Sequence, residues 1–356
     1  GIGTPLEDKL RPERSIGEES RLVDRRPADS ASGTDVCIIN TCALTQLSEA
    51  KSRKLIRRQI KHNPDTKLVI TGCYVEHSPD ELSRIIRGRN AIVVPNAKKD
   101  RIAEMLTEVT GNKKREISAV VNSGRVRAMV KVQDGCDHFC SYCIIPYLRG
   151  KPKSRPLEAI KEEVTRLVAT GYREVVLTGI NLGSYNYAVT IKTQPPVRGG
   201  SPRTQRINLT GLLEQLADIK GIERIRLSSI ELNYVTNELI ETIKRNKNVC
   251  PHLHIPLQSG SNRVLAAMNR RYTVEDYLER IDFIRHRLNN PSFTTDVLIG
   301  FPGETEQDFR DTAKACQSAG FSKIHIFPFS PRPGTSAAGM TNKVREGIVK
   351  ERFYQL

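Results

Sequence analysis

Three cysteines fall within eight residues of the sequence, at Cys136, Cys140 and Cys143. Thiolates at such short spacing bind zinc, hold an iron–sulfur cluster or form disulfides. Structural zinc takes four ligands, and no second Cys or His pair lies nearby at zinc-finger spacing. His138 lies between two of the cysteines, and we interpret it as a loop residue. A cluster with three cysteine ligands leaves one iron open to bind and activate a small molecule.

The cysteine motif lies in a region where strands and helices alternate. Short β-rich runs predict six strands, at 127–133, 174–179, 224–229, 252–257, 294–300 and 323–329. Apolar periodicity predicts helices between them, at 156–170, 210–219, 236–246, 261–268, 274–288 and 305–319. Two halves of a doubly wound sheet would also fit this order. The regular repeat favours an open, partial (βα)6 TIM-like barrel, in which chemistry is found at the C-terminal ends of the strands.

Polar and glycine-rich segments follow every predicted strand of this barrel. The cysteine motif follows the first strand, and the later strands lead into TGINLGSY, SSIE, QSGS, GFPGE and SPRPGT, which begin at residues 178, 228, 258, 300 and 330. Any one of these segments could simply turn a loop. Because all of them lie on the same rim, we expect them to surround the active site.

The residues before the barrel predict a smaller α/β domain with a parallel sheet. We interpret residues 1–34 as a loop or a poorly formed start. Strands are predicted at 34–42, 67–73 and 91–95, with a helix at 48–62 and further helices around the third strand. The domain is expected to end near residues 121–125.

Charge and composition limit the possible partners. The 356 residues carry a net charge of +16, with a sequence pI of about 9.6. A basic surplus indicates a polyanionic partner, nucleic acid ahead of membrane, although a solvated basic surface would also explain it. Eight cysteines without a secretory signal indicate a reducing compartment, so we expect a cytoplasmic protein with no membrane partner. The basic, Pro/Gly-rich segment 188–206 is interpreted as a surface loop.

The C-x3-C-x2-C spacing after the first barrel strand resembles the signature of the radical S-adenosylmethionine (SAM) superfamily. Further segments resemble its methylthiotransferases, most closely the MtaB-type branch: NTCALT, TGCYVE, QDGCDHFCSYCIIPYLRG, LTGINLGSY, RIRLSSIE, HLHIPLQSGS, DVLIGFPGET and FPFSPRPGT. The resemblance covers about residues 35–356. It implies a methylthiotransferase domain over 1–122, a radical SAM domain over 123–340, and a terminal helix at 341–356 that leads to an absent RNA-binding TRAM domain.

The resemblance implies two 4Fe–4S clusters. The first would be held by the cysteine trio, and its open iron would chelate SAM before one electron cleaves the sulfonium to a 5′-deoxyadenosyl radical. Cys42 and Cys73 would be two of the three ligands of an auxiliary cluster. Residues 1–36 contain no cysteine, so either the start is truncated or divergent, or this cluster is incomplete. We interpret Cys37, Cys250 and Cys316 as packing residues.

The same resemblance implies SAM contacts on the barrel rim. Gly179 and Asn181 would lie near the methionine and ribose parts, Ser229 and Glu231 would face the same cavity, and Gln258 is a further candidate. Ser229 or Gln258 could equally cap a helix.

Four basic residues follow the cysteines closely: Arg149, Lys151, Lys153 and Arg155. Beside an active site they would grip the phosphates around an extruded loop nucleotide, although they could also neutralise an anionic cluster.

The function implied is methylthiolation of carbon 2 of N6-threonylcarbamoyladenosine at position 37 of tRNA. The partners implied are a tRNA anticodon loop and an electron donor such as a flavodoxin or ferredoxin, and we expect a monomer. Two other methylthiotransferase targets stay open, namely isopentenyladenosine in tRNA and an aspartate of a ribosomal protein. A non-catalytic RNA-binding protein with zinc on its cysteines is the alternative from a different class.

Overall fold

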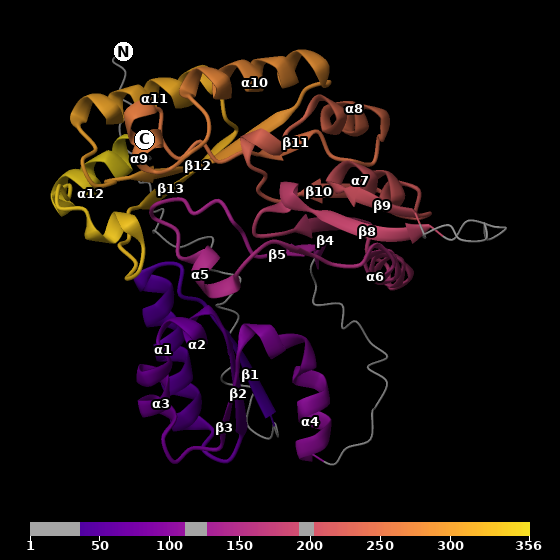
Figure 1. Cartoon of the computed structure of the whole chain (residues 1–356), viewed down its shortest axis with the longest axis vertical. Helices are drawn as coiled ribbons and strands as arrows, with labels where there is room; N and C mark the ends of the chain where they lie inside the picture. Colours follow the sequence, from indigo (N-terminus) through magenta and orange to yellow (C-terminus); the bar gives the residue numbers. More distant parts are fainter. Residues whose placement is uncertain (1–35, 111–126, 192–202) are drawn as a thin grey trace, which may run out of the picture.

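The computed structural model describes residues 36–110, 127–191 and 203–356. Figure 1 shows two parts, a smaller one in indigo and purple and a larger one in magenta to yellow, with helix α5 (Ile145–Arg149) between them. The domain boundary predicted near residue 122 lies outside the described residues.

The smaller part is a three-stranded parallel sheet with helices. Its strands are β1 (Val36–Thr41), β2 (Lys67–Gly72) and β3 (Ala91–Val94), in the order β1-β2-β3. The helical elements are α1 (Gln46–His62), α2 (Cys73–His77), α3 (Pro79–Ile86), the 3-10 helix η2 (Asn96–Arg101) and α4 (Ile102–Thr110). Buried Ile56 of α1, Ile70 of β2 and Leu82 of α3 belong to one apolar core, which ties the helices to the sheet.

The larger part is a partial barrel of parallel strands. They are β4 (Arg127–Lys131), β7 (Glu174–Thr178), β10 (Arg224–Leu227), β11 (His252–His254), β12 (Ser292–Ile299) and β13 (Lys323–Pro328). They pair as β4-β7-β10 and as β11-β12-β13, and the bridge between Ser229 and His254 joins the two sheets. The predicted α/β fold with a partial (βα)6 barrel is confirmed.

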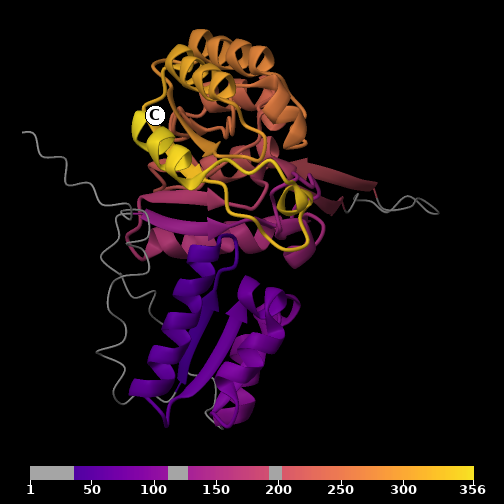
Figure 2. The ribbon, with the colours of Figure 1, turned by 90° about the vertical axis from the view of Figure 1, so that its left-hand side faces the viewer.

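Helices cover the outer face of the barrel, as Figure 2 shows from the side. They are α6 (Leu157–Ala169), α7 (Leu209–Ala217), α8 (Asn237–Arg245), α9 (Asn262–Ala267), α10 (Val274–Arg287), α11 (Glu306–Ala319) and α12 (Glu346–Gln355). Strand β12 alternates buried and half-buried residues along its whole length. Phe293 faces Arg285 of α10, whereas Asp296 contacts His254 on the neighbouring strand, so one face of the strand packs on helices and the other faces the barrel interior.

A buried carboxylate joins the N-terminal ends of the first three barrel strands. Glu174 on β7 forms ion pairs with Arg224 at 2.7 Å, Arg226 at 3.2 Å and Arg127 at 3.8 Å. Burial opposes ionisation of Glu174, but the hydrogen bonds and charges of these arginines outweigh it and lower its pKa. This contact lies at the opposite end of the strands from the cysteine loop and therefore serves stability.

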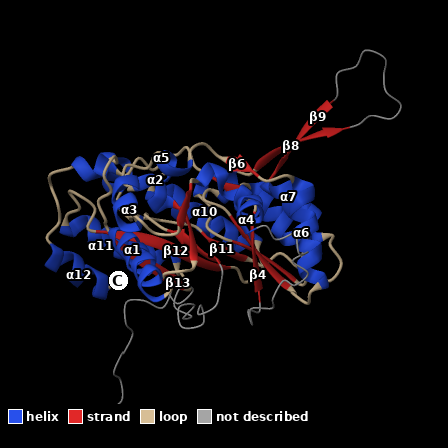
Figure 3. Cartoon of the chain, turned by 90° about the horizontal axis from the view of Figure 1, so that it is seen from below, coloured by secondary structure: helices blue, strands red, loops and turns tan. Residues whose placement is uncertain are grey.

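The interpretation of 188–206 as a surface loop is wrong for both of its ends. Strands β8 (Asn186–Ile191) and β9 (Arg203–Asn208) pair antiparallel and extend away from the barrel, as Figure 3 shows from below. Residues 192–202 lie outside the described part of the chain. In the parts of the chain that the structure describes, no helix has the length and apolarity needed to cross a membrane.

A buried carboxylate at the start of α11 provides a stability test. Asp308 accepts hydrogen bonds from Ser261 Oγ at 2.6 Å and from the backbone N and Oγ of Thr305 at 2.7 and 2.6 Å, and it pairs with Arg263. Burial opposes ionisation, but these donors outweigh it and the pKa of Asp308 is lowered.

We predict that Asp308→Asn lowers the free energy of unfolding at pH 7 by about 2 kcal/mol. Because the folded-state pKa is depressed, the stabilisation is complete above the unfolded pKa of about 3.9 and is lost as pH falls below it. Urea unfolding at pH 7 and about pH 3 should therefore show a difference that shrinks in acid. A difference of equal size at both pH values would contradict this.

Candidate active site

The cysteine loop leaves the barrel after β4 and the two-residue strand β5 (Gln133–Asp134) through a tight turn at Gly135. Gly135 has φ +76°, and a Cβ there would lie 2.3 Å from the carbonyl oxygen of Lys151, so only glycine fits. Cys136 N donates to Gly150 O at 3.0 Å, which closes the loop at the far end of α5. Cys143 N donates to Cys140 O at 2.9 Å, so the second and third cysteines share one turn.

The structure brings the three predicted ligands together in one partly buried loop. Burial raises the pKa of Cys136, and it raises the pKa of Cys143 to about 12; the charge of Cys140 adds to both shifts. Thiols this hard to ionise need a nearby cation to become thiolates. Iron provides that charge, and each cysteine of a 4Fe–4S site ligates a different iron, so the loop fits such a cluster. Among the described residues, no three His, Cys, Asp or Glu side chains are grouped to hold a single metal ion.

Gln133 connects the cysteine loop to the rim segment after β7. Its side chain is buried, and Nε2 donates to Gly135 O at 2.8 Å while Oε1 accepts from Asn181 N at 2.9 Å. Gly179 follows the end of β7, and a Cβ there would lie 3.0 Å from Gln133 Oε1, so the two segments pack without space between them. Sequence reasoning missed Gln133, although a glutamine in the otherwise apolar alternation before Gly-Cys could have indicated it.

Asn181 is the predicted SAM contact with the clearest structural features. It is 2 % exposed, its Nδ2 lies 3.3 Å from His138 Nε2, and its Oδ1 has no hydrogen-bond partner. A buried acceptor without a donor is costly, and a bound ligand with an N–H or O–H group would satisfy it. His138 stacks on the ring of Tyr234 at 5.8 Å, which places this loop histidine on the rim beside Asn181.

Glu231 lies on the same rim and is held by a buried arginine. Arg270 Nη1 donates to Glu231 Oε1 at 2.9 Å and also lies 3.6 Å from Cys140 Sγ. The arginine side chain is 3 % exposed, so its charge acts on the cysteine loop through little water. Arg270 was not predicted; the run NRR after α9 is its only mark in the sequence.

The remaining predicted SAM contacts lie at strand ends of the barrel. Ser229 forms an isolated parallel β-bridge with His254, and Gln258 forms one with Val297. The backbone of Gln258 has φ +66°. Neither side chain caps a described helix; α8 and α9 have Thr236 and Ser261 as their N-caps. The suggestion that Ser229 or Gln258 caps a helix is therefore wrong, and a role in binding SAM stays a prediction.

Cys42 and Cys73 directly follow two neighbouring strands, at the carboxyl edge of the smaller sheet. Thr41 pairs with Gly72 in parallel register, and each cysteine is the next residue of its strand. Arg149 of α5 reaches this edge: its Nε donates to Cys73 Sγ at 3.3 Å, and its Nη1 donates to Asp134 at 3.0 Å. The helix that follows the cysteine trio therefore contacts the second cysteine site directly. Any third ligand expected near the chain start lies outside the described residues.

The four basic residues after the trio differ in their surroundings. Arg149 contacts Cys73 and forms an ion pair with Asp134, and Arg155 forms an ion pair with Glu163 at 2.7 Å. Lys151 and Lys153 are exposed, the latter on the two-residue strand β6 (Lys153–Ser154) beside β5. Lys151 also lines a hollow next to the cysteine loop with Asp137, Ser184, Asn186, Arg206 and Tyr234. Contact of any of the four with RNA stays a prediction.

Comparison with known proteins decides the family. Residues 130–316 match the model of the Radical SAM superfamily, and residues 21–94 match one described as "Uncharacterized protein family UPF0004". "Threonylcarbamoyladenosine tRNA methylthiotransferase MtaB" of Chlamydia pneumoniae is 40% identical over 324 residues, which cover 91% of this chain and 72% of that protein. This chain belongs to the radical SAM methylthiotransferases. Such a protein works with a 4Fe–4S cluster and SAM, as its sequence predicted.

Two further relatives and one solved structure are also similar to this methylthiotransferase. The protein of the same name from Bacillus subtilis is 37% identical, covering 90% of this chain and 71% of the relative. The "tRNA-2-methylthio-N(6)-dimethylallyladenosine synthase" of Pelotomaculum thermopropionicum is 34% identical, covering 92% and 74%. The radical SAM methyltransferase TsrM from Kitasatospora setae shares 14% identity and superposes with a TM-score of 0.63, covering 85% of this chain and 65% of that one, which shows a common fold.

We predict that Gln133→Leu weakens SAM binding by about 10-fold or more while the cluster remains. The substitution removes the hydrogen-bond partner of the Asn181 backbone N–H and of the Gly135 carbonyl. Each unsatisfied group costs about 1–3 kcal/mol in free energy. Equilibrium dialysis of labelled SAM against the iron-reconstituted protein measures the change in SAM affinity. Gln317→Leu, on an exposed position of α11, is the control. Unchanged SAM affinity with normal iron content would contradict the role given to Gln133.

Proposed function

We propose that this methylthiotransferase attaches a methylthio group to carbon 2 of N6-threonylcarbamoyladenosine at position 37 of tRNA. The observation that carries the proposal is that α5 contacts both cysteine sites; relatives named threonylcarbamoyladenosine tRNA methylthiotransferase, at 37–40% identity, support it. The relatives that act on dimethylallyladenosine, at 34% and 37%, support the same chemistry on another modified adenosine.

The chemistry needs two sites because the carbon attacked bears a strong C–H bond. No side chain that acts as an acid or base at neutral pH removes such a hydrogen usefully. In our proposal Cys136, Cys140 and Cys143 hold the cluster that supplies one electron for cleaving SAM. Asn181 then offers its unpaired Oδ1 to SAM, and Arg270 keeps Glu231 oriented on the same rim.

Sulfur insertion is assigned to the smaller domain. Cys42 and Cys73 follow paired strand residues at one sheet edge, which suits two ligands of one cluster. The Arg149 guanidinium donates a hydrogen bond to the sulfur of Cys73 at 3.3 Å. Arg149 also donates to Asp134, which lies on β5 directly before the cysteine loop. One side chain therefore contacts Cys73 and the strand that leads into the cysteine trio.

The substrate RNA is proposed to approach over the exposed lysines next to the cysteine loop. Lys151 and Arg206 line the same hollow, where their charges could contact backbone phosphates. The net charge of +16 favours a polyanionic partner. We further propose that a flavodoxin or ferredoxin supplies the electron, and that the enzyme acts as a monomer in the cytoplasm.

The proposal is tested with three substrates offered to the reconstituted enzyme under strict anaerobic conditions. These are tRNA carrying threonylcarbamoyladenosine, tRNA carrying isopentenyladenosine, and a ribosomal protein. We predict that only the first gains a methylthio group, measured by mass spectrometry of nucleosides, and that Cys143→Ala abolishes product. Product on the second or third substrate alone would contradict the proposed specificity.

A further inference from the structure

The segment Ser330–Gly339, which follows the last barrel strand, contacts both domains. In Figures 1 and 2 this part of the yellow chain descends from β13 to the start of α1. Ser330 Oγ accepts a hydrogen bond from Gln46 N at 3.1 Å. At its other end Ala337 N donates to Ser141 O at 2.8 Å, and Ser141 lies between the ligands Cys140 and Cys143.

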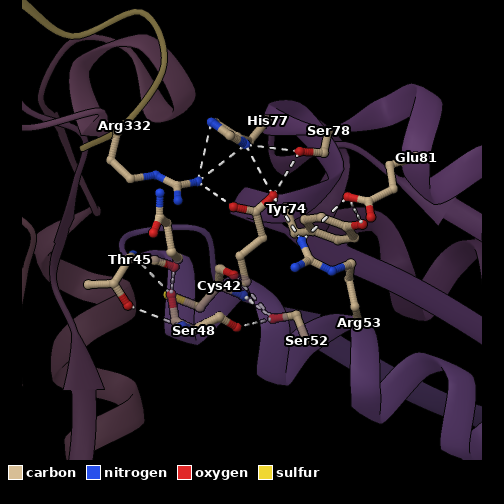
Figure 4. Close-up of polar contacts among 12 residues, drawn as sticks. Cys42, Thr45, Ser48, Ser52, Arg53, Tyr74, His77, Ser78, Glu81 and Arg332 are labelled. Atoms are coloured by element: carbon tan, nitrogen blue, oxygen red, sulfur yellow. Dashed lines mark hydrogen bonds and ion pairs between the residues drawn. The ribbon is translucent and has the colours of Figure 1, made fainter. Parts of the chain in front are cut away.

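Arg332 makes the strongest of these contacts across the domain boundary. Its Nη2 donates to Glu49 Oε2 of α1 at 2.6 Å and lies 3.3 Å from the ring nitrogens of His77 in α2. Arg332 is 2 % exposed and Glu49 7 %. Figure 4 shows Arg332 entering from the barrel side toward His77, Ser78 and the helix that carries Ser48 and Ser52.

Glu49 is itself held by its own domain. Ser78 Oγ donates to Glu49 Oε1 at 2.9 Å, and Arg53 lies 3.5 Å from the same oxygen. Burial opposes ionisation of Glu49, but the hydrogen bonds from Arg332 and Ser78 outweigh it and lower its pKa. The carboxylate is therefore charged in its pair with Arg332 and is held in place by Ser78 of its own domain.

The helix that carries Glu49 also holds Cys42. Cys42 N donates to Ser52 Oγ at 3.1 Å, and Ser52 lies one helical turn after Glu49 on α1. A short chain of contacts thus runs from Cys42 through Ser52 and α1 to Glu49 and Arg332. It continues through Thr335, whose Oγ1 donates to Arg332 O at 2.7 Å, to Ala337 and the loop of the cysteine trio.

We propose that Arg332 is a positioning residue that fixes the Cys42–Cys73 edge relative to the barrel rim, so that the sulfur donor lies within reach of the substrate carbon. The inference rests on the proposed function. A buried ion pair often contributes little to stability, and its geometry is better explained as a device for setting register between two parts. Arg332 Nε has no hydrogen-bond partner, so its burial is not accounted for by full hydrogen bonding.

If Arg332 has this role, its loss should affect two steps of the reaction differently. Cleavage of SAM needs the barrel site alone, whereas sulfur transfer needs both domains in register, and the Arg332 side chain contacts the smaller domain. Loss of Arg332 should therefore leave SAM cleavage largely intact and reduce methylthiolation, because a shift of about 1 Å between reacting groups can cost 100-fold in rate.

The test is the amount of 5′-deoxyadenosine formed for each methylthiolated nucleoside. We expect this ratio to rise about 10-fold or more in Arg332→Met and Glu49→Gln, and to rise less in Arg332→Lys, which keeps the charge. The chain offers a matched control in Arg352, which is 4 % exposed, donates to Glu304 at 2.6 Å and also has an unpartnered Nε. Both partners of that pair belong to the barrel, so Arg352→Met should leave the ratio unchanged.

Hydrogen–deuterium exchange of the protein without clusters gives a readout independent of turnover. Arg332→Met should speed exchange at Gln46 N and at Ala337 N, on the two sides of the boundary. Arg352→Met should speed it only around 300–306 and 345–356. An unchanged ratio in Arg332→Met, or faster exchange confined to residues 330–339, would overturn the positioning role. Wild-type protein that forms 5′-deoxyadenosine but no methylthio product would instead overturn the proposed function.

Discussion

The loop that carries Cys136, Cys140 and Cys143 is held on two sides, and the rest of the site depends on this restraint. On the barrel side, Gln133 and the turn at Gly135 fix where the loop begins. On the other side, the helix that follows the third cysteine packs Leu148 against the core of the smaller domain. The ligands therefore cannot move without moving the contact between the two domains.

This restraint explains why the two cysteine sites belong to one enzyme. In the function that we propose, a radical formed within the barrel is useful only if a sulfur donor lies at bonding distance, and the smaller domain would hold that donor. The chain uses two bridges, Arg149 from α5 and Arg332 from the segment after β13. Arg149 contacts Cys73 itself, whereas Arg332 contacts Glu49 of α1, the helix whose Ser52 accepts a hydrogen bond from the backbone of Cys42.

Much of the barrel could be predicted from the sequence, and so could the cysteine trio that the structure brings together in one loop. Cysteine ligands lie close together in the chain, and each barrel strand is a short apolar run followed by glycine, so both signals are local. Contacts across long separations were not visible. Glu49 and Arg332 are 283 residues apart, and neither stands in a motif that indicates the other. Gln133 and Arg270 were missed for the same reason: each acts through partners that only the fold brings near.

The hairpin of β8 and β9 was missed because its strands flank a basic, Pro/Gly-rich segment and because β9, RTQRIN, is itself polar and basic. Tyr187 and Ile207 lie opposite each other in this hairpin, and both pack at the edge of the barrel core. Asn181 shows the opposite case. It was named only by resemblance, and the structure gives it a buried oxygen without a partner, so its contact with SAM stays a prediction that now also has a physical argument.

The central claim is that three sulfurs hold a cluster with one iron free for SAM. The most direct measurement is electron paramagnetic resonance of the reduced, reconstituted protein before and after SAM is added. The account predicts a signal that changes with SAM in the wild type and in a Cys42→Ala/Cys73→Ala variant, and that is lost when Cys143→Ala is added to that double variant. A signal of the double variant that does not respond to SAM, or one that survives the addition of Cys143→Ala, would contradict it.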